Sequence, residues 1–157
     1  MENLTAQIRP FLDGDVAAAA RMERAHQPSP WSEKMFRDEL SGERRCYLAA
    51  ATDDLVGYGG VMAIGEEAHV NNLFVTPEQR RLGVGGRLLS SLMASAVELG
   101  ATRATLEVRM SNAPAIALYS GVGFAPVGAR PGYYGDEDAL IMWAYDINSI
   151  VPEGSTL

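Results

Sequence analysis

The chain has 157 residues, the size of one typical domain, and 47% of these residues are hydrophobic while 21% are charged. This composition excludes a wholly disordered chain. The formal net charge of −7 disfavours generic binding to nucleic acid or to an anionic membrane surface, so we expect neither as a partner.

Residue usage narrows the class of protein further. Cys46 is the single cysteine, which excludes an internal disulfide framework and predicts a cytoplasmic protein. The two histidines and the thiol are scattered along the chain without metal-ligand spacing, so we expect no metal site. The longest apolar runs fall short of the ~20 residues that a membrane helix needs, and Met1–Arg9 has no signal-peptide pattern.

The first half of the chain is predicted to combine a strand, two helices and a hairpin. Asp13 and Ser32 are residues that favour helix starts, and Gln27–Pro30 breaks the pattern between the two helices. The predicted elements are a strand at Ala6–Arg9, a helix from Asp13 to about Ala25, a helix after Ser32, and a hairpin of Arg45–Ala51 with Leu55–Ala63.

The second half is predicted to alternate strands and helices. Pro77 stops the first of these strands, and leucines at a spacing of three to four residues mark the longest helix. The elements are strands at His69–Val75, Arg103–Val108, Phe124–Val127 and Ala139–Ile147, with helices at Gly85–Leu99 and Asn112–Ser120. The pattern predicts a mixed α/β (α+β) sheet in a single domain, residues 1–150, followed by a disordered polar tail, residues 151–157.

The segment VTPEQRRLGVGGRLL, residues 75–89, carries the clearest ligand signal. Its glycines let backbone N–H groups approach a ligand, and the N-terminus of a helix favours anions, so the segment is typical of a phosphate site. It lacks the Gly-Lys-Ser/Thr of a P-loop, and Leu88 stands where a dinucleotide fingerprint needs a third glycine. From these residues alone, a glycine-rich turn with a solvated arginine face remains the alternative.

The motif RRLGVG, residues 80–85, resembles the acetyl-CoA pyrophosphate loop of the GNAT acyltransferases. The segments PWSEKMF (30–36), LEVRMSNAPAIALYSGVGF (106–124) and GYYGDEDALIM (132–142) resemble the RimI-type branch of that family, the ribosomal-protein-alanine N-acetyltransferases. The resemblance spans residues 8–147. It implies the GNAT fold, a mixed and mostly antiparallel sheet that splays at the acetyl-CoA site and carries about four helices, with acetyl-CoA as co-substrate and no metal.

The same resemblance assigns residues to acetyl-CoA. Three strand residues would line its pantetheine arm: Leu73, Phe74 and Val75. The N–H of Val75 would stabilise the thioester oxygen, and Asn112 would contact the arm besides capping its own helix. The pyrophosphate would be held, mainly by backbone groups, at Arg80, Arg81, Leu82, Gly83, Val84, Gly85 and Gly86.

Two residues would carry the chemistry. The resemblance makes Glu107 the general base, acting through water, and Tyr119 the general acid for the leaving thiolate. The alternative for Glu107 is a solvated strand face in contact with Arg109, and the alternative for Tyr119 is a half-buried core position. Cys46 lies outside every matched motif, which favours direct transfer over an acyl-enzyme. His26 and His69 are expected in surface or packing roles.

Three aromatic residues, Trp31, Tyr133 and Tyr134, would frame an acceptor peptide, with simple packing as the alternative. Phe74 replaces a residue that is commonly smaller in the family. The resemblance predicts transfer of an acetyl group to the N-terminal alanine of a protein, a small-subunit ribosomal protein being the expected partner. A small-molecule amine acetyltransferase is the first alternative. A non-catalytic acyl-CoA-binding module is the second, although such a module would need neither Glu107 nor Tyr119.

Overall fold

The computed structural model describes residues 5–151, apart from the side chain of Arg81. Of the predicted disordered tail, residues 152–157 lie outside the described part. The elements are β1 (Gln7–Pro10), α1 (Val16–His26), α2 (Glu33–Leu40), β2 (Arg45–Ala51), β3 (Leu55–Ile64), β4 (Glu67–Val75), α3 (Val84–Glu98), β5 (Arg103–Arg109), α4 (Ala113–Val122), β6 (Ala125–Arg130) and β7 (Ala139–Ala144). Short 3-10 turns occupy Asp13–Asp15, Pro77–Leu82 and Ile147–Ser149.

The described strands form one seven-stranded sheet in the order β1-β2-β3-β4-β5-β7-β6. Every neighbouring pair is antiparallel except β4 and β5, which run parallel. The predicted mixed, mostly antiparallel sheet with four α-helices is therefore confirmed. Among residues 5–151, no helix combines the length and the apolar character that crossing a bilayer requires.

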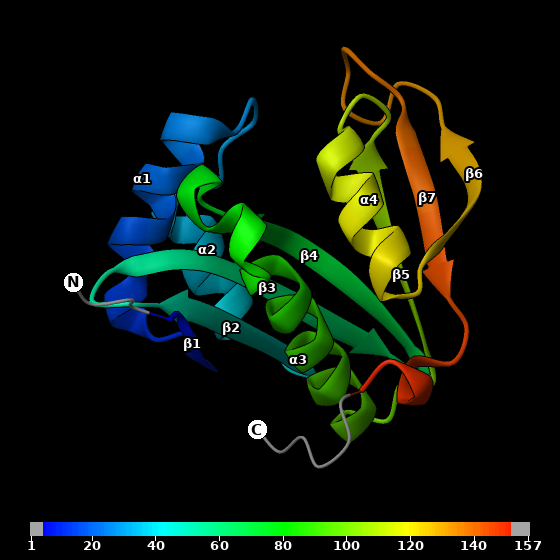
Figure 1. The fold of residues 1–157 in the computed structure, drawn as a ribbon, viewed down its shortest axis with the longest axis horizontal. Helices are drawn as coiled ribbons and strands as arrows, with labels where there is room; N and C mark the ends of the chain where they lie inside the picture. The colour runs from blue at the N-terminus through cyan, green and yellow to red at the C-terminus, as the bar shows by residue number, and fades with distance from the viewer. Residues whose placement is uncertain (1–4, 152–157) are drawn as a thin grey trace.

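The sheet opens between β4 and β5. Their pairing is limited to Glu67 with Arg103, Ala68 with Ala104 and His69 with Thr105. Beyond His69 the strands diverge, so that β1–β4 and the group β5–β7 form two wings joined at one end (Figure 1). The splay implied by the family resemblance is present, and it leaves a gap whose walls are the facing edges of β4 and β5.

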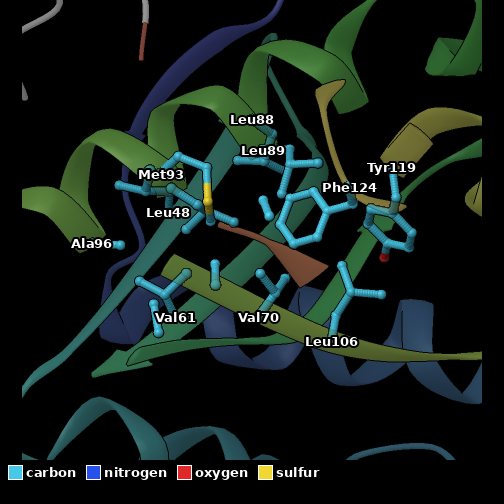
Figure 2. Packing of buried hydrophobic residues seen from close by; sticks show 14 of the residues in the cluster. Leu48, Val61, Val70, Leu88, Leu89, Met93, Ala96, Leu106, Tyr119 and Phe124 are labelled. Atoms are coloured by element: carbon cyan, nitrogen blue, oxygen red, sulfur yellow. The ribbon is translucent and has the colours of Figure 1, made fainter. Parts of the chain in front are cut away.

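Helices cover both faces of the sheet and create two cores. The leucines of α3 pack with residues of β2, β3, β5 and β7, and Phe124 joins this larger core between Leu89 and Tyr119 (Figure 2). On the opposite face α1 and α2 enclose an aromatic cluster that includes Phe36, Tyr58 and Phe74. The 3–4 spacing read from the sequence thus gives the buried stripe of α3, with Leu88, Leu89 and Leu92 fully buried.

Several predicted boundaries differ from the structure, and three of them have a clear local reason. The first α-helix starts at Val16, because residues 13–15 form a 3-10 turn in which the Asp15 carboxylate accepts from Leu12 N at 2.8 Å. Phe124 is not in a strand, since its N–H donates to Tyr119 O and closes the end of α4. The last strand stops at Ala144, and Ile147 enters the core from a 3-10 turn.

Candidate active site

A cavity of about 450 Å³ lies where β4 and β5 separate. Elements far apart in the sequence contribute to its wall: the α1–α2 connection, β4, β5, α4 and the loop before β7. The predicted site residues that line it are Trp31, Leu73, Glu107, Asn112, Tyr119, Tyr133 and Tyr134. The structure therefore brings together both predicted catalytic residues, the predicted acceptor frame and part of the predicted arm-binding set.

Glu107 does not lie on a solvated face. Its side chain is only 7% exposed, and its Oε1 lies 2.8 Å from His69 Nε2 and 3.5 Å from the hydroxyl of Tyr133, which donates to it. The contact with Arg109 suggested by strand alternation is not its pairing, because Arg109 instead pairs with Asp136 and Glu137. A buried carboxylate held by donors is suited to accept a proton from a substrate.

Helix α4 brings Asn112 and Tyr119 to the same cavity, as their seven-residue spacing predicts. Asn112 is confirmed as the N-cap, its Oδ1 accepting from Ala115 N at 3.3 Å. Tyr119 is 8% exposed, with its ring 6.1 Å from that of Phe124. Burial, with a smaller contribution from Tyr134, raises the pKa of Tyr119 above its ordinary value, so its phenol stays protonated and able to donate.

The three predicted acceptor-frame residues, Trp31, Tyr133 and Tyr134, form the outer wall of the cavity. Tyr133 and Tyr134 pack edge to face with ring centroids 4.9 Å apart, and Arg109 lies over the Tyr134 ring at 4.4 Å. Burial, followed by the nearby Tyr133 and Glu107, raises the pKa of Tyr134 to about 12. Trp31 contacts Phe36 from the α1–α2 connection. These rings supply apolar contact surface with neutral hydroxyl groups at its edge.

The three predicted arm-binding residues of β4 divide between its two faces. Leu73 lines the cavity and Val75 belongs to the larger core, whereas Phe74 lies in the aromatic core on the other face. The bulky Phe74 side chain therefore does not intrude on the gap. Thr76 N donates to Val56 O, so strand alternation turns the N–H of Val75 away from β3 and toward the β5 side.

The glycine loop lies at the N-terminus of α3, outside the residues that line the cavity. Gly83 has a φ of +77°, a left-handed conformation that favours glycine, and α3 begins at the next residue. The first N–H groups of a helix have no partner within it, which leaves those of Val84, Gly85 and Gly86 for an anion. Leu82 is exposed, and the side chain of Arg81 lies outside the described part.

Arg80 points back to its own strand rather than outward. Its Nε donates to Val75 O at 2.9 Å, and its guanidinium lies 5.5 Å from the centroid of Phe74. The side chain of Arg80 thus holds the turn that connects β4 with α3. Because Arg80 is engaged in this way, the backbone N–H groups at the start of α3 are better placed than its guanidinium to meet an anion.

Among the cavity residues that the sequence reasoning missed, three carry polar side chains with notable surroundings: Glu23, His69 and Asn72. Glu23 is 1% exposed and accepts from Trp31 N and from the Tyr58 hydroxyl. Asn72 has a φ of +48° at a bulge of β4, and its buried Nδ2 has no hydrogen-bond partner within residues 5–151. An unpartnered donor in a strand that lines the cavity can pair with a carbonyl of a bound substrate. For Glu23 the sequence offered one signal, which is that an acidic residue stands near the end of the apolar face of a helix.

Comparison with known proteins agrees with this geometry. The acetyltransferase (GNAT) family model matches residues 16–124. A Salmonella typhimurium protein named [ribosomal protein bS18]-alanine N-acetyltransferase is 38% identical over 133 residues, which is 82% of this chain and 89% of the relative.

Two solved structures show the same fold. The crystal structure of the ribosomal-protein-S18-alanine N-acetyltransferase from Escherichia coli superposes with a TM-score of 0.79 at 33% identity, covering 97% of this chain and 98% of the other. NAA60 of Arabidopsis thaliana, solved in complex with acetyl-CoA, has a TM-score of 0.81 at 20% identity, covering 92% and 99%. With the splayed sheet, the glycine loop and the carboxylate–phenol cavity, these matches establish that the chain belongs to the GNAT family and is an acetyl-CoA-dependent N-acetyltransferase.

Proposed function

We propose that this enzyme transfers the acetyl group of acetyl-CoA to the α-amino group of an N-terminal alanine on a small-subunit ribosomal protein. A carboxylate, Glu107, and a phenol, Tyr119, line one cavity framed by aromatic residues, and this juxtaposition carries the proposal. The names of the relatives support the acceptor class. The proposed setting for this reaction is the cytoplasm.

Glu107 serves as the general base. An α-amino group has a pKa of ~7.7–8.0 and is largely protonated at neutral pH, so it must lose a proton before its nitrogen can attack. The Glu107 carboxylate takes that proton, directly or through one water molecule, and its negative charge also attracts the ammonium form. The amine then attacks the thioester carbon directly.

Tyr119 serves as the general acid. As the carbon–sulfur bond breaks, the sulfur gains negative charge and the phenol donates its proton to the departing thiolate. The raised pKa of Tyr119 keeps this proton in place across the working pH range. The N–H of Val75, turned toward the gap, is the donor for the thioester oxygen as it gains charge.

The remaining predicted residues hold the two substrates. The backbone of residues 80–86 binds the pyrophosphate, while Leu73 and Asn112 contact the pantetheine arm. Trp31, Tyr133 and Tyr134 frame the extended acceptor peptide.

A small acceptor panel tests the proposal. Peptides that differ only in their first residue, alanine, serine, glycine or methionine, are compared with an N-terminally blocked lysine peptide and with an aminoglycoside. Acetylation, measured by mass spectrometry, should be fastest on the free N-terminal alanine. Equal rates on the blocked lysine peptide, or a preference for the aminoglycoside, would contradict the proposed acceptor and favour the small-molecule alternative.

A further inference from the structure

The two oxygens of Glu107 have unequal surroundings. His69 Nε2 lies 2.8 Å from Oε1, and the Tyr133 hydroxyl donates to the same oxygen at 3.5 Å. Arg130 Nε lies 3.8 Å from Oε2, beyond hydrogen-bond range. Because the side chain is 7% exposed, these contacts rather than bulk water determine how the carboxylate is oriented.

His69 occupies the point at which the sheet opens. It pairs with Thr105 in the last register position shared by β4 and β5. Glu107 lies two residues farther along β5 and so shares a strand face with Thr105. The imidazole therefore reaches the carboxylate diagonally across the two strands. At this point the strands have begun to separate, but their side chains can still form a hydrogen bond across the gap.

We propose that His69 is a positioning residue for the base: its Nε2–H holds Oε1 of Glu107 and thereby leaves Oε2 as the oxygen that accepts the proton of the amine. The inference rests on the proposed role of Glu107. An ionised carboxylate can only accept hydrogen bonds, so the ring proton of His69 belongs on Nε2. A donor that fixes one oxygen orients the other and reduces the cost of reorganisation during proton transfer.

The groups around the pair leave His69 as the main donor to Oε1. Tyr133 approaches from the loop before β7 at a longer distance, and its pKa is raised by partial burial and then by Glu107, so it remains a neutral phenol. From β3, Met62 faces His69, and Arg45 contacts the Met62 sulfur at 3.2 Å. The other charged groups nearby are Arg130 on β6, Arg109 with Asp136 and Glu137, and Glu23 on the cavity wall.

Two substitutions of His69 separate positioning from packing. His69→Leu replaces the imidazole with an apolar side chain of similar bulk and so removes the hydrogen-bond donor. His69→Gln retains an N–H donor of similar reach. We expect kcat/KM for the peptide to fall roughly 10- to 100-fold in His69→Leu and to recover largely in His69→Gln, with the Kd for acetyl-CoA within about twofold of the parent. Equal losses in the two variants would overturn the proposal.

The matched control is His26→Leu, which removes the other imidazole of the chain. The His26 ring packs 5.3 Å from that of Phe74, and His26 is not among the residues that line the cavity. A positioning role specific to His69 predicts that His26→Leu keeps the parent dependence of rate on pH. A fall in kcat/KM equal to that of His69→Leu would assign the effect to general loss of packing.

A double variant distinguishes failure of this inference from failure of the proposed function. If His69 acts through Glu107, His69→Leu combined with Glu107→Gln should be no slower than Glu107→Gln alone, and both single deficits should shrink above the amine pKa of ~8. If the rate losses of the two single variants multiply in the double variant, the positioning role is overturned while Glu107 remains the base. An unimpaired Glu107→Gln enzyme would overturn the proposed base itself.

Discussion

A Cβ atom on Gly85 would lie 3.1 Å from Leu118 Cδ2, so the missing side chain of Gly85 faces α4. Gly85 is buried, and this close approach lets the N-terminal turn of α3 pack against α4, the helix that carries Tyr119. The glycine therefore serves the packing of the two helices that flank the open end of the sheet.

We expect Gly85→Val to lower the free energy of unfolding by about 1–3 kcal/mol, because the branched side chain overpacks the α3–α4 contact. Gly85→Ala should be far milder, since the end of the half-buried Leu118 side chain can shift. Adding Leu118→Ala to Gly85→Val should restore much of the stability, measured by urea unfolding, and the acetyl-CoA affinity, measured by calorimetry. If stability recovers in this double variant but acetyl-CoA affinity does not, Gly85 instead lacks a side chain so that the ligand can approach the backbone closely.

Tyr119→Phe keeps the buried ring and removes the phenolic proton. Turnover should fall by roughly 10²–10⁴, while acetyl-CoA affinity changes little, because the proton is needed only as sulfur gains charge. Since burial raises the pKa of Tyr119, the deficit should persist up to the highest pH the enzyme tolerates. Tyr145→Phe, at an exposed position stacked on Trp143, is the matched control and should retain normal turnover.

Glu23→Gln should destabilise the α1–α2 connection. Both carboxylate oxygens accept, one from Trp31 N at 3.0 Å and the other from the Tyr58 hydroxyl. The amide has only one oxygen to accept from these two donors, which we expect to cost about 1–3 kcal/mol of stability and to raise the KM for the peptide as Trp31 shifts. Tyr58→Phe in the Glu23→Gln background removes the opposing donor and should restore part of the loss, as thermal unfolding can show.

The Arg9–Asp15 pair predicts a pH-dependent stability. Arg9 donates to both oxygens of Asp15 at 2.7 and 2.9 Å, and this pairing is the main cause that lowers the pKa of Asp15. A lowered folded-state pKa means that the stabilisation is complete above the unfolded value of ~3.9 and is lost as pH falls through the lower folded value. Asp15→Asn should cost about 1–2 kcal/mol at pH 7 and converge with the parent at strongly acidic pH. Asp53→Asn, in the exposed turn of the hairpin, should show no such dependence.

Local signals in the sequence were sufficient for most of the elements. The predicted strand Arg45–Ala51 matches β2, and the predicted helix Gly85–Leu99 differs from α3 by one residue at each end. Apolar periodicity, N-caps such as Ser32 and Asn112, and turn residues act over a few residues, so they can be read without knowing the fold.

The sequence by itself also predicted a set of site residues, through the motifs that carry the family resemblance, and seven of these residues line one cavity. Only the tertiary structure decided their surroundings. Glu107 could be read as solvated because alternation along one strand does not show what lies opposite, and His69, its partner, is 38 residues away in sequence. That contact exists because β4 and β5 pair over three positions and then separate, and this geometry depends on the packing of whole strands and helices rather than on any local pattern.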